Sequence, residues 1–256
     1  MFNNVDTRSV TFNIIVLNAI LFVVCHFIPH LNSVLSLHYF FNKHDYLQTL
    51  YNGSIDASQF PNLSAFAQQA YYYGERGSFL PVQIITHMFM HGSISHIFFN
   101  MFGLFTLGIV LERVWGANRY LLFYITTGFG AVILHMAVQA FMVYQATRSV
   151  DPSMSMLENN PEIWSTYFSS TVGASGALFG VLTAFGMLFP NTELYLMFIP
   201  IPIKAKYFVI FYILIELYLG VAMYGGDNVA HFAHLGGALF GFILVKYWNR
   251  NRNSLF

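Results

Sequence analysis

Charged residues are scarce in this chain of 256 residues, where Asp, Glu, Lys and Arg together make up 9%, against roughly a quarter of a typical soluble domain. Eleven Lys and Arg residues balance eleven Asp and Glu residues, so no excess of positive charge favours binding to nucleic acid. The low charge and high apolar content exclude intrinsic disorder. Cys25 is the only cysteine, which excludes an intrachain disulfide and a disulfide-rich scaffold.

Apolar residues are abundant, at 56% of the chain, and the mean hydropathy is +0.56. A membrane-spanning helix needs roughly 20 mainly apolar residues. Because backbone groups must be hydrogen-bonded within lipid, each such stretch is expected to be helical. The sequence therefore predicts an all-α, polytopic membrane protein with a bundle of six transmembrane helices. The six predicted spans are about 11–28, 94–110, 120–144, 172–189, 207–223 and 229–248.

Two of the connecting segments are long. Residues 31–80 are mixed in polarity and rich in Tyr and Phe, which favours a loop lying at the membrane interface. Residues 147–171 read as a polar loop, and the other connections are short. We therefore expect residues 1–256 to form a single membrane domain with an interfacial first outer loop.

The distribution of Lys and Arg predicts the orientation of the chain. If the termini share one side with the turns at 111–119 and 190–206, that side carries eight cations, against three on the other. Both termini are therefore predicted to be cytoplasmic. The absence of a transit-peptide pattern favours the plasma (inner) membrane of a bacterium. The eight cations are Arg8, Arg113, Arg119, Lys204, Lys206, Lys246, Arg250 and Arg252, and the three are Lys43, Arg76 and Arg148.

Several residues that are costly in lipid lie within the predicted spans. The second span carries His96 and Asn100, which are four residues apart and therefore on one helix face. The fourth span begins with Ser175 between small residues, and the sixth begins with His231 and His234. Each has a structural interpretation when taken alone. Ser175 could be a packing residue, His234 a hydrogen-bonded structural histidine, and the pair His96 and Asn100 could form an interhelical hydrogen bond.

The predicted topology brings these residues to a similar depth. The second, fourth and sixth spans run in the same direction, and the polar residues lie near the start of each. Stripes of small residues permit the fourth and sixth spans to approach closely. If these faces meet, Ser175 comes within reach of His234, and a serine beside a neutral histidine is a nucleophile with its general base. The stripes are Gly173, Ala177, Gly180 and Ala184, and Ala230, His234, Gly237 and Gly241.

Acyl transfer also needs donors for the developing oxyanion. His96 and Asn100 offer side-chain donors on one face, and the Ser175 backbone N–H lies in a first helical turn, where amides lack internal partners. No acidic residue lies beside His234 in the sequence. We therefore expect a Ser–His dyad whose imidazole is oriented by packing, with Phe179, one turn after the serine, as its packing partner.

Three ordered motifs resemble those of the rhomboid family of intramembrane serine proteases. Residues 173–176, Gly-Ala-Ser-Gly, are similar to the GxSG motif of that family; residues 91–100 read HxxxxHxxxN, and residues 234–241 read HxxGxxxG. The resemblance covers the chain from about residue 80 onward. It departs at Val82-Gln83, where many members have Trp-Arg.

The resemblance implies a six-helix fold around a water-filled cavity, with residues 80–248 as the catalytic core and the 224–228 loop as a flexible cap. It implies substrates that are single-span transmembrane proteins within the lipid bilayer, and neither a metal nor another cofactor. The oligomeric state stays open. The implied site consists of Ser175 as nucleophile, His234 as base, His96, Asn100 and the Ser175 amide as oxyanion hole, and Phe179, Gly173, Gly176, Gly237 and Gly241 as supporting residues.

Two other functions are open. A non-proteolytic rhomboid-like protein would bind and retain membrane clients, but the chain keeps both Ser175 and His234. A metal transporter could use the intramembrane histidines, but no acidic residue accompanies them and the GxSG motif would be unexplained. Glu216 has no assigned role, and we expect it to pair with a histidine or backbone group, or to make a cytoplasmic-side contact. The histidines are His87, His91, His96, His231 and His234.

Overall fold

The computed structural model describes residues 9–42, 50, 53, 56–72, 78–196, 199–222 and 230–250. The chain divides into two compact units, which we describe separately. The first unit comprises residues 1–20, 91–135 and 173–256, and the second comprises 21–90 and 136–172. The predicted cap at 224–228 and the last of the three consecutive tyrosines at 71–73 lie outside the described residues.

Helices form at all six predicted spans, with bounds within a few residues of those expected. Within the described residues, four helices are long and apolar enough to cross a membrane: Val10–Phe27, Ile94–Trp115, Ala117–Thr147 and Ala205–Ala222. The protein is thus an all-α, polytopic membrane protein, while the count of six spans stays a prediction. The helices are α1 (Val10–Phe27), α6 (Ile94–Gly103) continuing through η3 (Leu104–Gly108) into α7 (Ile109–Trp115), α8 (Ala117–Thr147), α11 (Ser175–Leu188), α12 (Ala205–Ala222) and α13 (His231–Asn249).

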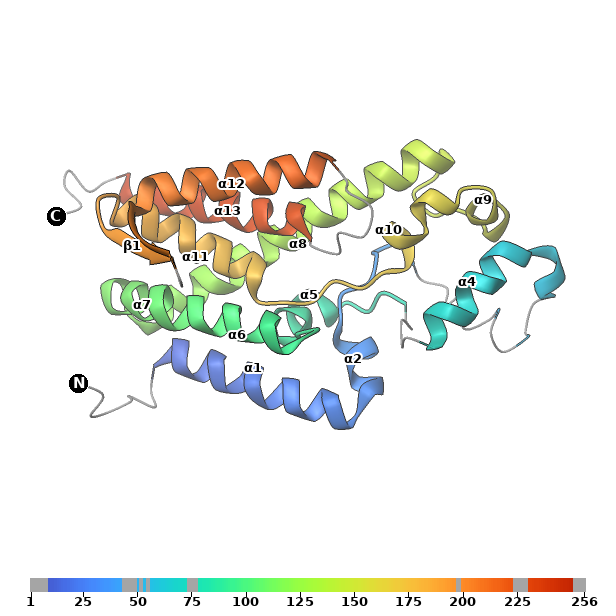
Figure 1. Ribbon diagram of the computed structural model, residues 1–256, viewed down its shortest axis with the longest axis horizontal. Helices are drawn as coiled ribbons and strands as arrows, with labels where there is room; N and C mark the ends of the chain where they lie inside the picture. Colours follow the sequence, from blue (N-terminus) through green and yellow to red (C-terminus); the bar gives the residue numbers. More distant parts are fainter. Residues whose placement is uncertain are drawn as a thin grey trace. The chain divides into compact units, whose positions relative to one another are not determined.

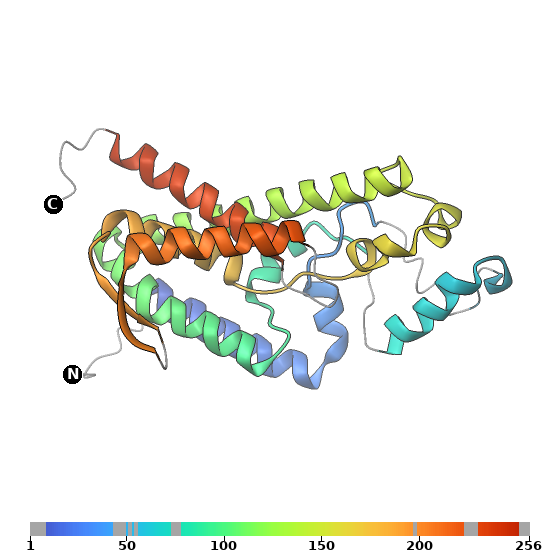
Figure 2. The ribbon, with the colours of Figure 1, turned by 45° about the horizontal axis from the view of Figure 1, so that its top comes forward.

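Helix α11 forms the core of the first unit. Eleven of its fourteen residues are buried, as expected for a helix that is apolar on every side. It packs against α12 and α13, which lie beside it in both views (Figures 1 and 2). Fourteen residues make a helix about 21 Å long, shorter than the roughly 30 Å hydrocarbon core of a bilayer. The end of α11 that carries Ser175 is therefore compatible with a position below the membrane surface.

Glycines allow α11 and α13 to approach backbone to backbone. A Cβ atom at Gly237 would overlap the carbonyl oxygen of Gly176, and one at Gly241 would lie 2.8 Å from Gly180 Cα. The sequence therefore identified the correct pair of helices. On α11, however, Gly176 makes the contact with Gly237, and the predicted stripe did not include this glycine.

A β-hairpin joins α11 to α12, where the sequence analysis expected only a short turn. Strand β1 (Glu193–Leu196) pairs antiparallel with β2 (Ile199–Lys204), and Glu193 lies opposite Lys204. The hairpin is drawn in orange beside the start of α12 (Figure 2). Strand β2 has the sequence Ile-Pro-Ile-Pro-Ile-Lys. Because proline lacks an N–H, it suits an edge strand, and the alternation of isoleucine with proline was a signal for such a strand.

The second unit contains short helices, most of them in the two connecting segments 31–80 and 147–171, for which the sequence analysis predicted no helices. The position of residues 31–80 at the membrane interface stays a prediction. The short helices surround an aromatic core that includes Tyr39, Tyr167 and Phe168. Burial of these rings stabilises helices too short to form alone. The elements are α2 (Pro29–Leu35), η1 (Ala57–Gln59), α4 (Pro61–Tyr72), α5 (Gln83–Thr86), η2 (His87–Phe89), α9 (Met154–Glu158), η4 (Pro161–Ile163) and α10 (Trp164–Phe168).

Side chains distant in the sequence hold this second unit together. Glu158 accepts hydrogen bonds from the backbone amides of Asn62 and Leu63 at the start of α4, at 3.0 and 2.8 Å, and thereby satisfies two of the amides that a helix leaves unpaired. Gln83 is fully buried. It accepts from the backbone amides of His38 and Leu80 and donates to the backbone carbonyls of Val34 and Ser78.

Candidate active site

Ser175 is the first residue of α11, and the backbone just before it has an unusual conformation. Gly173 has φ +129°, a value that residues with a Cβ rarely adopt. A Cβ there would also lie 2.8 Å from His96 Nε2. Ala174 is the N-cap residue and provides no side-chain hydrogen bond. The first-turn amides of α11, beginning with that of Ser175, therefore lack a side-chain cap.

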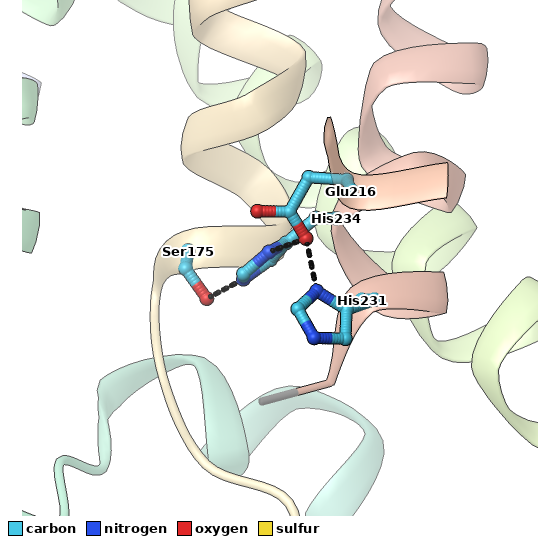
Figure 3. A network of polar contacts seen from close by, with 4 residues as sticks. All are labelled: Ser175, Glu216, His231 and His234. Carbon is cyan, nitrogen blue, oxygen red and sulfur yellow. Dashed lines mark hydrogen bonds and ion pairs between the residues drawn. The ribbon is translucent and has the colours of Figure 1, made fainter. Parts of the chain in front are cut away.

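His234, in the first turn of α13, lies directly beside this serine. Its Nε2 atom is 2.8 Å from Ser175 Oγ, within hydrogen-bonding distance (Figure 3). The imidazole is buried and stacks on the Phe179 ring, with centroids 4.3 Å apart and planes inclined by 6°. The structure thus brings together the serine, the histidine and the aromatic ring that the sequence analysis singled out.

A carboxylate also contacts the histidine, contrary to the expectation that the imidazole would have no acidic partner. Oε2 of Glu216, on α12, lies 2.8 Å from His234 Nδ1 and 2.7 Å from His231 Nδ1 (Figure 3). All three side chains are buried. The expectation failed because the acid comes from the neighbouring helix, 18 residues before the histidine. Of the roles considered for Glu216, the structure selects the pairing with histidine.

The two predicted oxyanion donors are on α6, in the same unit. The His96 ring lies beside Gly173, two residues before Ser175. It contacts the His91 ring edge-on, with centroids 4.9 Å apart. Asn100 is buried, and its Nδ2 donates to the backbone carbonyl of His96 one turn earlier, at 2.9 Å. An amide nitrogen carries two protons, so this bond leaves Asn100 one further proton to donate.

The cluster of Glu216, His231 and His234 could also form a metal site. Among the described residues, Glu216, His231 and His234 form a group of metal-type donors whose ligand atoms lie within 4.8 Å of one another. An acidic residue therefore does accompany the histidines, and that reason for rejecting a metal function is wrong. The two Nδ1 atoms and the carboxylate oxygen already share hydrogen bonds, so the cluster is satisfied without a cation.

Comparison with known proteins decides the family. The profile of the Rhomboid domain matches residues 80–250, about two thirds of the chain. The chain belongs to the rhomboid family. This confirms the resemblance seen in the three motifs.

Individual relatives agree with this assignment. This rhomboid is 32% identical over 181 residues to RHOMBOID-like protein 6, mitochondrial, of Arabidopsis thaliana, an alignment that covers 67% of this chain and 48% of the relative. It is 26% identical over 214 residues to Rhomboid protease AarA of Providencia stuartii, covering 78% and 66%. It is 28% identical over 161 residues to Rhomboid protease GluP of Bacillus subtilis, covering 62% and 24%. The matched region spans about a third to a half of the Arabidopsis relatives.

Proposed function

We propose that this rhomboid is an intramembrane serine endopeptidase that hydrolyses peptide bonds within or near the transmembrane segments of single-span membrane proteins. Ser175 acts as nucleophile and His234 as general base. The observation that carries the proposal is the 2.8 Å contact between Ser175 Oγ and His234 Nε2. The family membership and the printed names of AarA and GluP, both rhomboid proteases, support it.

The first half of the reaction forms an acyl-enzyme. Ser175 Oγ attacks the carbonyl carbon of the scissile peptide bond while His234 Nε2 takes the hydroxyl proton. The tetrahedral intermediate collapses as the C–N bond breaks, and His234 returns the proton to the leaving amine. The N-terminal part of the substrate is then an ester on Ser175, and the C-terminal part leaves as a free amine.

The second half of the reaction consumes one water. His234 takes a proton from the water as its oxygen attacks the ester carbonyl, and then returns the proton to Ser175 Oγ as the ester bond breaks. The products are a carboxylic acid and a free enzyme with its original proton. This step needs water inside an apolar bundle. We propose that the water enters through the cavity, open to the outer side, that the family resemblance implies.

Three groups stabilise the oxyanion that develops in each half. The Ser175 amide lies at the N-terminus of α11, where the helix dipole also favours negative charge. His96 and the second Nδ2 proton of Asn100 supply side-chain donors from α6. In a site with little water such donors act strongly on developing charge. Residues 80–248 form the catalytic core in this proposal.

The proposal also includes the orientation of the protein and the membrane in which it lies. We place both termini in the cytoplasm on the distribution of Lys and Arg, and we propose the plasma membrane of a bacterium as the compartment. The relatives include bacterial proteins and proteins named as mitochondrial. Fusion of a reporter that is active only in the cytoplasm to the C-terminus tests the orientation, and activity of the fused reporter is the expected result.

The enzymatic test is cleavage of a single-span reporter protein by the purified chain in detergent and in liposomes. Ser175→Ala and His234→Ala should each abolish cleavage while the protein still unfolds at a temperature near that of the wild type. Ser170→Ala, which removes an exposed serine five residues earlier, is the matched control and should cleave normally. Undiminished cleavage by either of the first two variants would contradict the proposal.

The non-proteolytic alternative makes the opposite prediction in the same assay. A protein that only binds membrane clients would co-purify with the single-span reporter without cutting it. Ser175→Ala would then change neither binding nor the length of the reporter. The paired serine and histidine favour the protease, because a binding protein needs no hydrogen bond between a nucleophile and a base.

A further inference from the structure

One carboxylate oxygen in the first unit serves two histidines. Oε2 of Glu216 lies 2.7 Å from His231 Nδ1 and 2.8 Å from His234 Nδ1, and the two imidazole planes are nearly perpendicular, at 89°. Glu216 itself is 6% exposed. A charge in such a place is costly unless it is paired and hydrogen-bonded. The cost indicates that the carboxylate does more than fill space between helices.

The position of this carboxylate is built into the packing of α12 on α13. Gly220 lies one turn after Glu216 on α12, and a Cβ there would be 3.1 Å from the Cβ of His231. The small residue lets the start of α13 approach α12 at the level of the carboxylate. Figure 3 shows the resulting line of contacts from Ser175 through His234 to Glu216, with His231 branching from the same oxygen.

The chemistry of the carboxylate selects one tautomer of His234. An ionised carboxylate can only accept hydrogen bonds, so each Nδ1 that contacts it carries a proton. Two donors on one oxygen also favour the ionised form of the carboxyl group. With its proton on Nδ1, neutral His234 has a lone pair on Nε2. Ser175 Oγ therefore donates to Nε2, which is the arrangement that a general base requires.

The same carboxylate stabilises the charge that appears during proton transfer. When His234 accepts the serine proton it becomes an imidazolium, and Glu216 then faces a positive ring at hydrogen-bonding distance. Attraction between opposite charges is stronger in a site with little water than in bulk solvent. His231 holds Oε2 from the other side and so restricts where the carboxylate can move.

We infer that Glu216 is a positioning residue of this rhomboid: it fixes the tautomer and orientation of His234 and stabilises its protonated form, so that a serine, a histidine and a glutamate act in line. This inference rests on the proposed function, because it assigns a role within the reaction of Ser175 and His234. Stacking on Phe179 fixes the plane of the ring but selects no tautomer. The carboxylate supplies that selection.

The test compares Glu216→Gln with the wild type in the single-span cleavage assay, over a range of pH. The variant keeps the shape of the side chain and loses its charge. We expect kcat to fall by up to about 10⁴-fold, the loss that follows removal of the acid from a serine triad, with KM within about threefold. Glu216→Asp should recover part of the rate. Glu193→Gln, which neutralises an exposed glutamate on β1, is the matched control and should behave as the wild type.

The pH dependence separates positioning from a structural role. Without the negative partner the imidazolium that forms during proton transfer is less stable, so we expect the acidic limb of the pH–rate profile to move to lower pH. Among the described residues, the other titratable groups near this histidine and its carboxylate are His231 on α13, Tyr212 on α12 and His96 on α6. All of them are retained in the variant. A loss of structure alone would lower the rate without moving the limb.

The outcomes distinguish failure of this inference from failure of the proposed function. If the wild type does not cleave, or if Ser175→Ala cleaves equally well, the protease proposal fails. If the wild type cleaves and Glu216→Gln matches it in kcat and in pH dependence, the inference alone is overturned. If Glu216→Gln does not purify as a folded protein, His231→Leu replaces it. Removal of that donor should lower kcat at constant KM, and an unchanged kcat would overturn the inference.

Discussion

Gly237 of α13 lies against the carbonyl oxygen of Gly176 of α11 so closely that no side chain fits between them. Gly176 follows Ser175 directly, and Gly237 lies three residues after His234. The approach of the two helices is therefore set within one turn of the serine and the histidine. Backbone packing at this point determines the distance between the two side chains.

This contact predicts that Gly237→Ala is damaging. The added methyl overlaps backbone that cannot move aside as a side chain would, so we expect a loss of about 1–3 kcal/mol in the free energy of unfolding. The two helices must also separate, so cleavage should fall at least tenfold. Leu239→Phe, at an exposed position of the same helix, adds bulk where there is room and should leave both quantities unchanged. Wild-type stability in Gly237→Ala would contradict the described packing.

The oxyanion donors predict a graded loss of rate. His96→Ala or Asn100→Ala should lower kcat by roughly 10- to 1,000-fold without abolishing cleavage, because the Ser175 amide remains. KM should change little if the donors act on the transition state. Phe99→Ala, at an exposed position of the same helix, is the control. A double variant with the rate of the wild type would remove α6 from the mechanism.

A second, partly buried network of hydrogen bonds predicts an effect on stability rather than on rate. Glu112 of α7 accepts hydrogen bonds from the hydroxyls of Ser9 and Thr11 and from the amides of Val10 and Thr11, at 2.7–2.9 Å. A carboxylate there satisfies the first amides of α1 and suits the helix dipole. Glu112→Ala should cost about 1–3 kcal/mol in unfolding free energy.

Thermal unfolding in detergent measures that cost. Glu112→Gln keeps one acceptor and should lose less stability than the alanine variant, and Glu193→Gln on the exposed hairpin should lose none. An alanine variant as stable as the wild type would show that this carboxylate does not hold α1 in place.

The Glu216–His231–His234 cluster predicts a response to chelators. Its donor atoms are already joined by hydrogen bonds, and the proposed mechanism uses no cation. EDTA should therefore leave the rate of reporter cleavage unchanged. Loss of cleavage in EDTA followed by recovery in zinc would instead favour a metal function for the cluster.

Most of the first unit was predictable from local patterns. Long apolar stretches located the helices, and glycine spacing identified α11 and α13 as partners. The serine and histidine could be paired because each lies near the start of a helix with the same direction. Glu216 could not be assigned, because it lies in the middle of an apolar helix and nothing in its own neighbourhood indicates which face meets His234. A buried carboxylate in a span was the signal, and the partner required the fold.

The second unit was less predictable because its order depends on contacts distant in sequence. The amides at the start of α4 are hydrogen-bonded by Glu158, more than ninety residues away. No local capping motif in the sequence therefore indicates where this helix begins. Gln83 likewise donates a hydrogen bond to the backbone carbonyl of Val34 and accepts one from the backbone amide of Leu80. The hairpin between α11 and α12 was missed because residues 190–206 were interpreted only as a short connection between two spans.

The most direct test of the central claim is labelling of the purified protein with a serine-directed fluorophosphonate, followed by mass spectrometry of the labelled peptide. The account predicts a covalent adduct on Ser175, formed at a reduced rate in His234→Ala and not formed in Ser175→Ala, while Ser170→Ala labels as the wild type does. The account would be contradicted if protein that cleaves the reporter formed no adduct on Ser175, or if Ser175→Ala were labelled as strongly as the wild type.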